Sequence, residues 1–156
     1  MDSEQIERIK EISKPIVEQE DLYLVDVAEE HSGEPVLWIY VDSEEGDVSV
    51  DACTRISREL GFVLDAHENI RSRYRLNVSS PGLSRPLSDI RQYRKNRGRV
   101  ARIKYRDSDG YHKLEGVLKQ VDPDRLEVET ESGERHSVTF ESIAETKIIP
   151  TLSGRK

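Results

Sequence analysis

Arginine side chains clustered in one part of the chain are the residues best suited to act on a partner. Residues 71–106 contain 12 Lys/Arg and one Asp/Glu, a net charge of +11, whereas residues 1–70 contain 5 and 19, a net charge of −14. Residues 107–156 carry −4, so the whole chain of 156 residues has a net charge of −7. A basic segment of this kind is suited to bind RNA, because guanidinium groups pair with phosphates and stack on bases.

The spacing of the arginines indicates two groups. Arg71, Arg73 and Arg75 alternate along the chain, so a strand would project all three from one face, and Asn77 continues the row. The second group consists of Arg91, Arg94, Lys95, Arg97, Arg99 and Arg102. The alternative is that these cations only neutralise the acidic half through surface ion pairs, each worth about 0–1 kcal/mol. The size of the excess favours a binding role.

No other residues form a pattern typical of catalysis or of a cofactor site. The four histidines have no partner at metal-ligand spacing and no recognisable nucleophile nearby. Cys53 lies in a helical pattern, where a small buried residue is the expected role. The acidic stretch 42–51 lacks the spacing of a calcium loop, which favours a solvated turn. We therefore predict a protein that is not an enzyme and needs no metal, cofactor or small-molecule substrate.

The segment Ser79-Ser80-Pro81-Gly82 lies beside the basic groups and interrupts regular structure. It has no lysine and lacks the spacing of a phosphate-binding loop. Pro81 fixes φ and Gly82 permits a positive φ, so this pair can reverse the chain directly after a strand, while the serine hydroxyls cap backbone groups or contact a partner. Local chemistry thus predicts a structural turn.

Residues 1–82 must position these groups, and their periodicity predicts an α+β domain with the order helix, strand, strand, helix, strand. The first helix starts behind a capping box of Asp2 and Gln5 and ends near Glu20, and Ser49 is the expected N-cap of the second. The strands are expected at 22–28, 36–42 and 74–78.

Trp38 and Tyr40 share one face of the second of these strands. They could form a stacking surface for bases, but packing in the core is the more common role of such a pair. We therefore expect them in the core.

The rest of the chain predicts a junction and a second, β-rich domain. Residues 83–98 contain Pro86 and then a short helix capped by Ser88 and Asp89, which indicates the junction. Residues 99–150 alternate short strands with turn signals, about five strands in all, which predicts a small closed or nearly closed barrel of the SH3-like or Sm-like type. Residues 151–156 are expected to be a tail.

Neither a membrane span nor a signal peptide is indicated by the sequence. No apolar run approaches the ~18 residues that a bilayer requires, and the N-terminus lacks a basic start followed by an apolar stretch. We expect a cytoplasmic protein, without membrane partners and monomeric.

Several stretches resemble the bacterial ribosome maturation factor RimP. They are Leu24-Val25-Asp26-Val27, Leu37-Trp38-Ile39-Tyr40-Val41-Asp42, Ser57-Arg58-Glu59-Leu60 and, most specifically, Val78-Ser79-Ser80-Pro81-Gly82-Leu83-Ser84-Arg85-Pro86-Leu87. The resemblance implies an N-terminal α+β domain joined to an SH3-like barrel. It also implies non-catalytic assistance to small (30S) subunit assembly, through the immature subunit, 16S rRNA near the central pseudoknot and the basic ribosomal protein of the decoding centre. Ser84 stands where the family often carries an aspartate. The resemblance would imply an ion pair between that aspartate and Arg85, and a serine at position 84 cannot form it.

Spacing and resemblance together define the expected site. The ribosome- or RNA-binding residues are Arg71, Arg73, Arg75, Ser79, Ser80, Arg85, Arg91, Arg94, Lys95 and Arg97, and the structural junction residues are Pro81, Gly82 and Pro86. The alternative is a free-standing Sm-like regulator that binds messenger or small RNAs. A hydrolase is a third possibility, but no residue is nominated for it.

Overall fold

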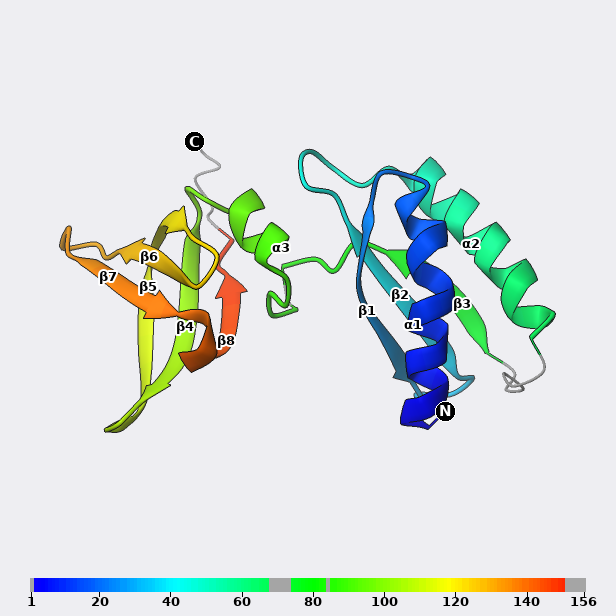
Figure 1. Cartoon of the computed structure of the whole chain (residues 1–156), viewed down its shortest axis with the longest axis horizontal. Coiled ribbons are helices and arrows are strands. Elements are labelled where there is room, and N and C mark those ends of the chain that lie inside the picture. Colours follow the sequence, from blue (N-terminus) through cyan, green and yellow to red (C-terminus); the bar gives the residue numbers. More distant parts are fainter. Residues whose placement is uncertain (1, 68–73, 84, 151–156) are drawn as a thin grey trace. The chain divides into compact units, whose positions relative to one another are not determined.

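The computed structural model describes residues 2–67, 74–83 and 85–150, and the chain divides into two compact units between Pro81 and Gly82 (Figure 1). The helices and strands of the first unit are α1 (Ser3–Glu18), β1 (Tyr23–Glu30), β2 (Val36–Asp42), α2 (Val50–Asp65) and β3 (Arg75–Ser79). The predicted order of these elements is confirmed.

Both long helices begin at the caps that the sequence indicates. Asp2 accepts a hydrogen bond from the Gln5 backbone N–H at 2.8 Å, and the Gln5 side chain accepts one from the Asp2 N–H at 3.2 Å. Ser49 Oγ accepts from the Ala52 N–H at 3.1 Å. These bonds satisfy backbone donors that the first turn of a helix leaves without partners, and so they fix where α1 and α2 begin.

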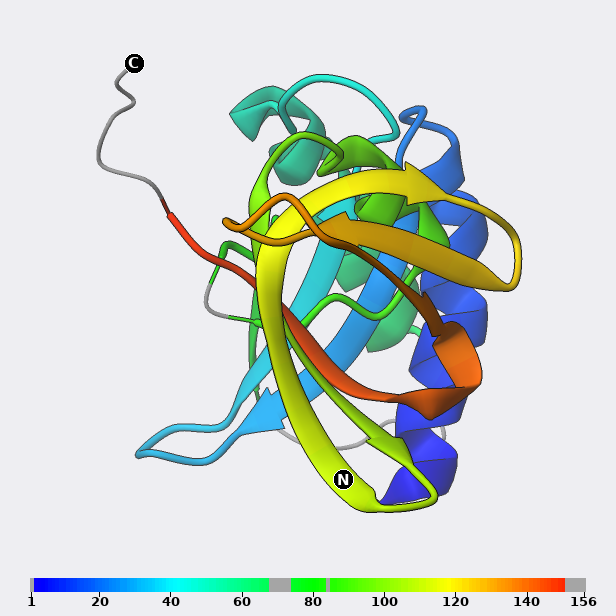
Figure 2. The same cartoon turned by 90° about the vertical axis from the view of Figure 1, so that its left-hand side faces the viewer.

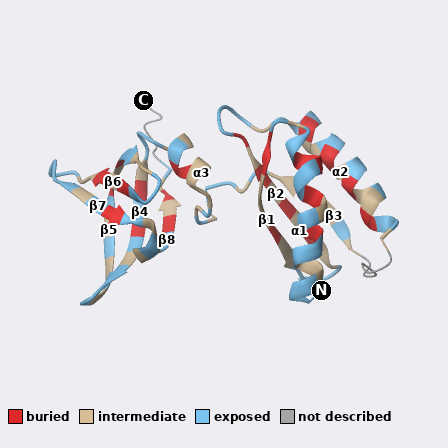
Figure 3. Ribbon diagram, viewed as in Figure 1, coloured by how far each residue is buried: buried red, intermediate tan, exposed pale blue. Residues whose placement is uncertain are grey.

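The sheet of the first unit has the order β1-β2-β3, and one of its faces carries the core. β2 pairs antiparallel with β1 and parallel with β3, which α2 connects to β2. Leu37, Ile39 and Val41 of β2 are fully buried. They pack with buried residues of both helices, including Ile9 and Val17 of α1 and Ile56, Leu60 and Leu64 of α2. Both helices therefore cover the same face of the sheet (Figures 1 and 3).

The second unit contains one short helix and a five-stranded antiparallel sheet. Its elements are α3 (Ile90–Lys95), β4 (Val100–Asp107), β5 (Gly110–Val121), β6 (Arg125–Glu129), β7 (Arg135–Thr139), the 3₁₀ helix η1 (Phe140–Ser142) and β8 (Ile143–Ile148). Strands β4 to β7 follow one another, and β8 then pairs with β4, which gives the order β7-β6-β5-β4-β8.

The predicted closed barrel is not seen in the second unit. The sheet is strongly curved (Figure 2), but its strand pairing is open between β7 and β8 across residues 85–150. η1 carries the chain from one edge strand to the other without a hairpin that would pair them. The curved sheet still encloses a core, in which Ile103, Leu118 and Leu126 are fully buried.

Two close contacts stabilise the second unit, one made by a side chain of α3 and one between the backbones of β5 and β6. The Tyr93 hydroxyl of α3 donates a buried hydrogen bond to Thr146 Oγ1 of β8 at 2.9 Å, and its ring meets Phe140 edge-on. Gly116 of β5 lies so close to β6 that a Cβ atom there would be 2.5 Å from the Glu129 carbonyl oxygen. α3 is thus tied to the sheet, and β5 needs a glycine at this crossing.

None of the described helices is long and apolar enough to cross a membrane.

Candidate functional site

The predicted row of polar side chains on β3 lies on the face of the sheet that the helices do not cover. Leu76 and Val78 pack against the core, so Arg75, Asn77 and Ser79, which alternate with them, project to the opposite face. Arg75 is exposed, and Asn77 and Ser79 are half-buried. Arg71 and Arg73 lie outside the described residues. The structure thus places the described part of the predicted row on one face.

Two aromatic rings lie beside this row. Trp38 pairs with Asn77 and Tyr40 with Ser79 in the β2–β3 register, so both rings share the face of Arg75. The rings are stacked, with 5.8 Å between centroids and 5° between planes. The prediction that they pack in the core was wrong, because the alternate row of Leu37, Ile39 and Val41 faces the helices. With both helices on one side, the aromatic row is left half-buried on the other.

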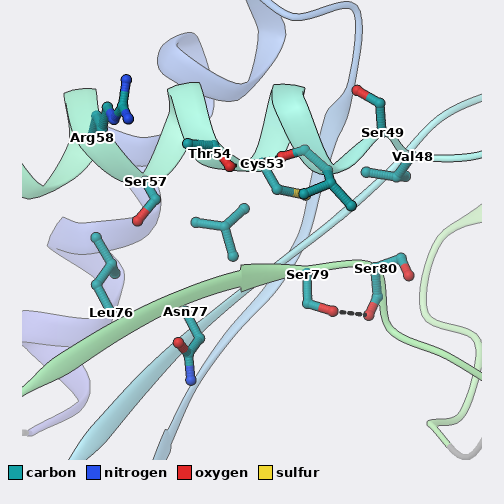
Figure 4. Close-up of a pocket in the computed structure, with 12 residues that line it drawn as sticks. Val48, Ser49, Cys53, Thr54, Ser57, Arg58, Leu76, Asn77, Ser79 and Ser80 are labelled. Atoms are coloured by element: carbon teal, nitrogen blue, oxygen red, sulfur yellow. Dashed lines mark hydrogen bonds between the residues drawn. The ribbon is translucent and has the colours of Figure 1, made fainter.

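A groove of about 570 Å³ runs between α2 and β3, on the helix-covered side of the sheet (Figure 4). Leu76 points toward α2 in this view, whereas Asn77 points away from it (Figure 4). The groove is lined by Val48, Ser49, Val50, Cys53, Thr54, Ser57, Arg58, Leu76, Asn77, Val78, Ser79 and Ser80. Ser79 and Ser80 were expected at the site, but the α2 residues were not, because only the folded chain brings this helix beside β3.

Cys53 is half-buried in the wall of the groove. Burial raises the pKa of its thiol. A raised pKa lowers the thiolate fraction at neutral pH, so this cysteine is a poor nucleophile and acts as a small apolar wall residue.

The segment after β3 has a positive φ at its glycine. Ser79 Oγ donates to the Ser80 carbonyl oxygen at 2.9 Å (Figure 4), and Gly82 has a φ of +73°. A side chain is strained at such a φ, which is the reason for glycine at this position. The positive φ that the sequence permits at Gly82 is therefore present, whereas a reversal of the chain at Pro81 and Gly82 stays a prediction. Pro86 is followed by Leu87, whose N–H donates to the Thr146 carbonyl oxygen at 2.8 Å, so the chain joins the second unit at this point.

The predicted cations in and beside α3 differ in their partners and exposure. Arg91 forms two hydrogen bonds with the Asp89 carboxylate, each 2.9 Å long, and these bonds hold the pKa of Asp89 below its usual value. Arg94 and Arg97 are exposed, and within the described part of the chain no carboxylate forms an ion pair with either. Arg85 and Lys95 are half-buried. Arg94 of α3 and Arg97, which follows α3 and donates from Nε to the Arg94 carbonyl oxygen at 3.1 Å, are thus exposed cations that can meet an anionic partner.

Ion pairs inside the second unit account for part of the basic segment. Besides Arg91 with Asp89, Arg102 pairs with Glu115 on the neighbouring strand at 3.0 Å. Neutralisation therefore explains some of the arginines but leaves Arg94 and Arg97 without such partners in the described residues. No group of three or more metal-ligating side chains occurs within residues 2–67, 74–83 and 85–150.

Comparison with known protein families finds a match for the first unit. Residues 12–84 match the family described as the RimP N-terminal domain. The chain carries a RimP N-terminal domain. Over residues 12–84, the match confirms the resemblance to the ribosome maturation factor RimP that the sequence indicates. The match extends from within α1 to just beyond Gly82, so it includes the groove, β3 and the Trp38–Tyr40 pair.

Proposed function

We propose that this protein assists assembly of the small (30S) ribosomal subunit by binding the immature subunit, without covalent chemistry. The observation that carries the proposal is the match of residues 12–84 to the RimP N-terminal domain. Binding that is stronger to productive than to unproductive conformations of the subunit shifts the population toward assembly. Such a factor needs complementary surfaces and no active site.

The basic residues are the proposed contacts to 16S rRNA. Arg75 is exposed on β3, next to Asn77 and the stacked Trp38–Tyr40 pair, a combination that suits phosphates and unstacked bases. The full proposed set is Arg71, Arg73, Arg75, Ser79, Ser80, Arg85, Arg91, Arg94, Lys95 and Arg97. The acidic surface of residues 1–70 is the proposed dock for a basic ribosomal protein of the decoding centre. Residues 83–98 act in this proposal as the junction between an N-terminal domain of residues 1–82 and an SH3-like domain of residues 99–150.

Charge reversal at Arg73 and Arg75 tests the proposed rRNA contacts. We expect the double variant Arg73→Glu, Arg75→Glu to co-sediment with immature small subunits less than the unmodified protein does, with the largest difference at low salt. A matched control reverses Arg125 and Arg135, which lie outside the basic segment and pair with neighbouring acids. Equal sedimentation of both double variants across the salt series would show that Arg73 and Arg75 are not used.

Deletion of the gene tests the function itself. We expect fewer mature small subunits and more 16S precursor, both restored by the intact protein. Normal subunit profiles and precursor levels in the deletion strain would remove the proposed role.

The stacked aromatic pair favours a second candidate, a free-standing regulator that binds single-stranded messenger or small RNAs. Crosslinking in cells separates the two. A dominant 16S signal supports assembly, whereas a spread over messages supports regulation.

A further inference from the structure

The outer edge of β3 offers backbone groups to a partner. β3 is an edge strand, and across the described residues it pairs only with β2. The Arg75 N–H donates to the Pro35 carbonyl oxygen at 2.9 Å on the β2 side. Because a ladder alternates, the N–H and C=O groups of Leu76 and Val78 point to the outer edge. An edge of this kind is a template for a further strand.

The groove lies directly along this edge and has an apolar floor. Leu76, Val78 and Val48 supply the floor, and Cys53 together with serine and threonine hydroxyls lines the walls. The outer rim of α2 carries two of the large apolar side chains that are exposed in the described residues, Val50 at 80% and Phe62 at 78%. Val50, Thr54, Arg58 and Phe62 recur every four residues, so they form one stripe along the helix. Of the two apolar residues, Val50 lines the groove and adds an exposed apolar side chain to it, whereas Phe62 is not among the lining residues.

The charge around the groove selects the class of partner. No carboxylate is among its lining residues, and Arg58 is their only charged side chain. The loop that leads into Val48, however, exposes Glu44, Glu45 and Asp47, within a segment of net charge −14. An occupant with a neutral backbone, small apolar side chains and basic flanks fits this arrangement. RNA fits it less well, because phosphates are repelled by the acidic loop and have no donor for the outward carbonyl groups of β3.

We propose that the groove between α2 and β3 binds an extended basic peptide, which adds to the free edge of β3 as a fourth strand. The proposal rests on the proposed function in one respect, which is that such a peptide would come from a basic protein of the small subunit. Main-chain hydrogen bonds to Leu76 and Val78 hold the strand, and alternate side chains of the peptide enter the groove.

Backbone methylation of a peptide tests the strand pairing. The probe is a ten-residue peptide of alternating valine and arginine, titrated into the full-length protein. Methylating the N–H groups of one alternate set of residues is expected to weaken binding about tenfold or more, while methylating the other set changes it little, because only one set faces β3. Hydrogen exchange at the Leu76 and Val78 amides should slow on binding. Equal effects of the two methylated sets, or unchanged exchange at both amides, would overturn the proposal.

Substitutions on α2 test the groove. Ser57→Arg fills the groove with a charged side chain and is expected to weaken peptide binding about tenfold. Glu59→Gln is the control, because it changes the net charge by the same +1 at an exposed position outside the groove lining. It should change the affinity for the peptide by no more than about twofold. Val50→Ala, which removes an exposed apolar side chain from the groove lining, should weaken binding several-fold, whereas Tyr111→Ala, which removes an aromatic side chain 61% exposed in the second unit, should not.

An RNA probe and the subunit assay separate the possible outcomes. If oligouridine displaces the peptide and Ser57→Arg strengthens RNA binding, the groove is an RNA site and the peptide proposal is wrong. Failure of the deletion strain to show an assembly defect, with peptide binding intact, would remove the proposed function and leave the strand-addition site standing.

Discussion

At the scale of single residues, the Asp89 carboxylate has two roles at the start of α3. Its carboxylate caps α3 by accepting from the Arg91 N–H at 2.9 Å, and it also receives both hydrogen bonds from the Arg91 guanidinium. One acid thus fixes the start of the helix and the position of a cation that had been predicted to contact RNA.

Replacing Asp89 with alanine should lower the free energy of unfolding of the second unit by about 0.5–2 kcal/mol at pH 7, the usual effect of losing an N-cap. The folded-state pKa of Asp89 is lowered, chiefly by the Arg91 hydrogen bonds. Its contribution is therefore complete above the unfolded-state pKa, about 3.9, and is lost as the pH falls through the lower folded-state value.

Denaturant titrations at several pH values check this expectation. The difference between the unmodified protein and Asp89→Ala should shrink as the pH falls below about 4. Asp124→Ala, which removes a carboxylate 3.4 Å from Arg125 on the exposed surface, serves as the control and should change stability by less than about 1 kcal/mol. A difference for Asp89→Ala that does not vary with pH would show that the carboxylate charge is not responsible.

At the scale of elements, the two described glycines that lack a positive φ show how closely neighbouring elements pack. Gly116 brings β5 against the β6 backbone, with 2.5 Å from a Cβ there to the Glu129 oxygen. Gly61 of α2 faces β3, and the nearest atom to its added Cβ would be a Leu76 methyl at 3.8 Å. One position is therefore closed to a methyl group and the other is open.

Gly116→Ala should destabilise the second unit by about 1–3 kcal/mol, because the backbone must shift to admit the methyl group. Gly61→Ala is the matched control in the first unit. It should raise helix stability by about 0.5–1 kcal/mol, since alanine favours a helix interior and meets no clash. Thermal or denaturant unfolding of both variants measures the effect. A neutral Gly116→Ala would mean that β5 and β6 separate without cost.

Local signals predicted the elements better than their contacts. Asp2, Ser49 and Asp89 were correctly expected as helix caps, because capping depends on residues three or fewer positions away. Alternation in β2 defined two rows but not which one the helices cover, and so Trp38 and Tyr40 were misplaced. The groove could not be predicted, since α2 and β3 meet only after the chain folds. The pairing of Arg91 with Asp89, two residues away, could have been expected from the sequence alone.

At the scale of the whole molecule, the charge distribution is strongly uneven. Residues 71–106 carry +11 and residues 1–70 carry −14, and these are the two segments that we propose to contact RNA and a basic protein, respectively. Raising the salt concentration should weaken binding at these charged surfaces more than binding through apolar contacts, because salt screens only charge.

The salt dependence of subunit binding should identify the phosphate contacts. We expect the logarithm of the association constant to fall linearly with the logarithm of salt concentration, with a slope smaller by about 0.7–0.9 for each phosphate contact removed. Arg94→Ala with Arg97→Ala should therefore reduce the slope, whereas Arg125→Ala with Arg135→Ala should leave it unchanged. Identical slopes for the two double variants would exclude Arg94 and Arg97 as phosphate ligands.

The position of Trp38 gives this protein a built-in optical reporter. It is the only tryptophan of the chain, and its indole lies parallel to Tyr40 on the face away from the helices. Indole fluorescence responds to rings that stack on it. Emission from the unlabelled protein should therefore register a base that reaches this face, while a peptide in the groove on the opposite side of the sheet should leave it almost unchanged.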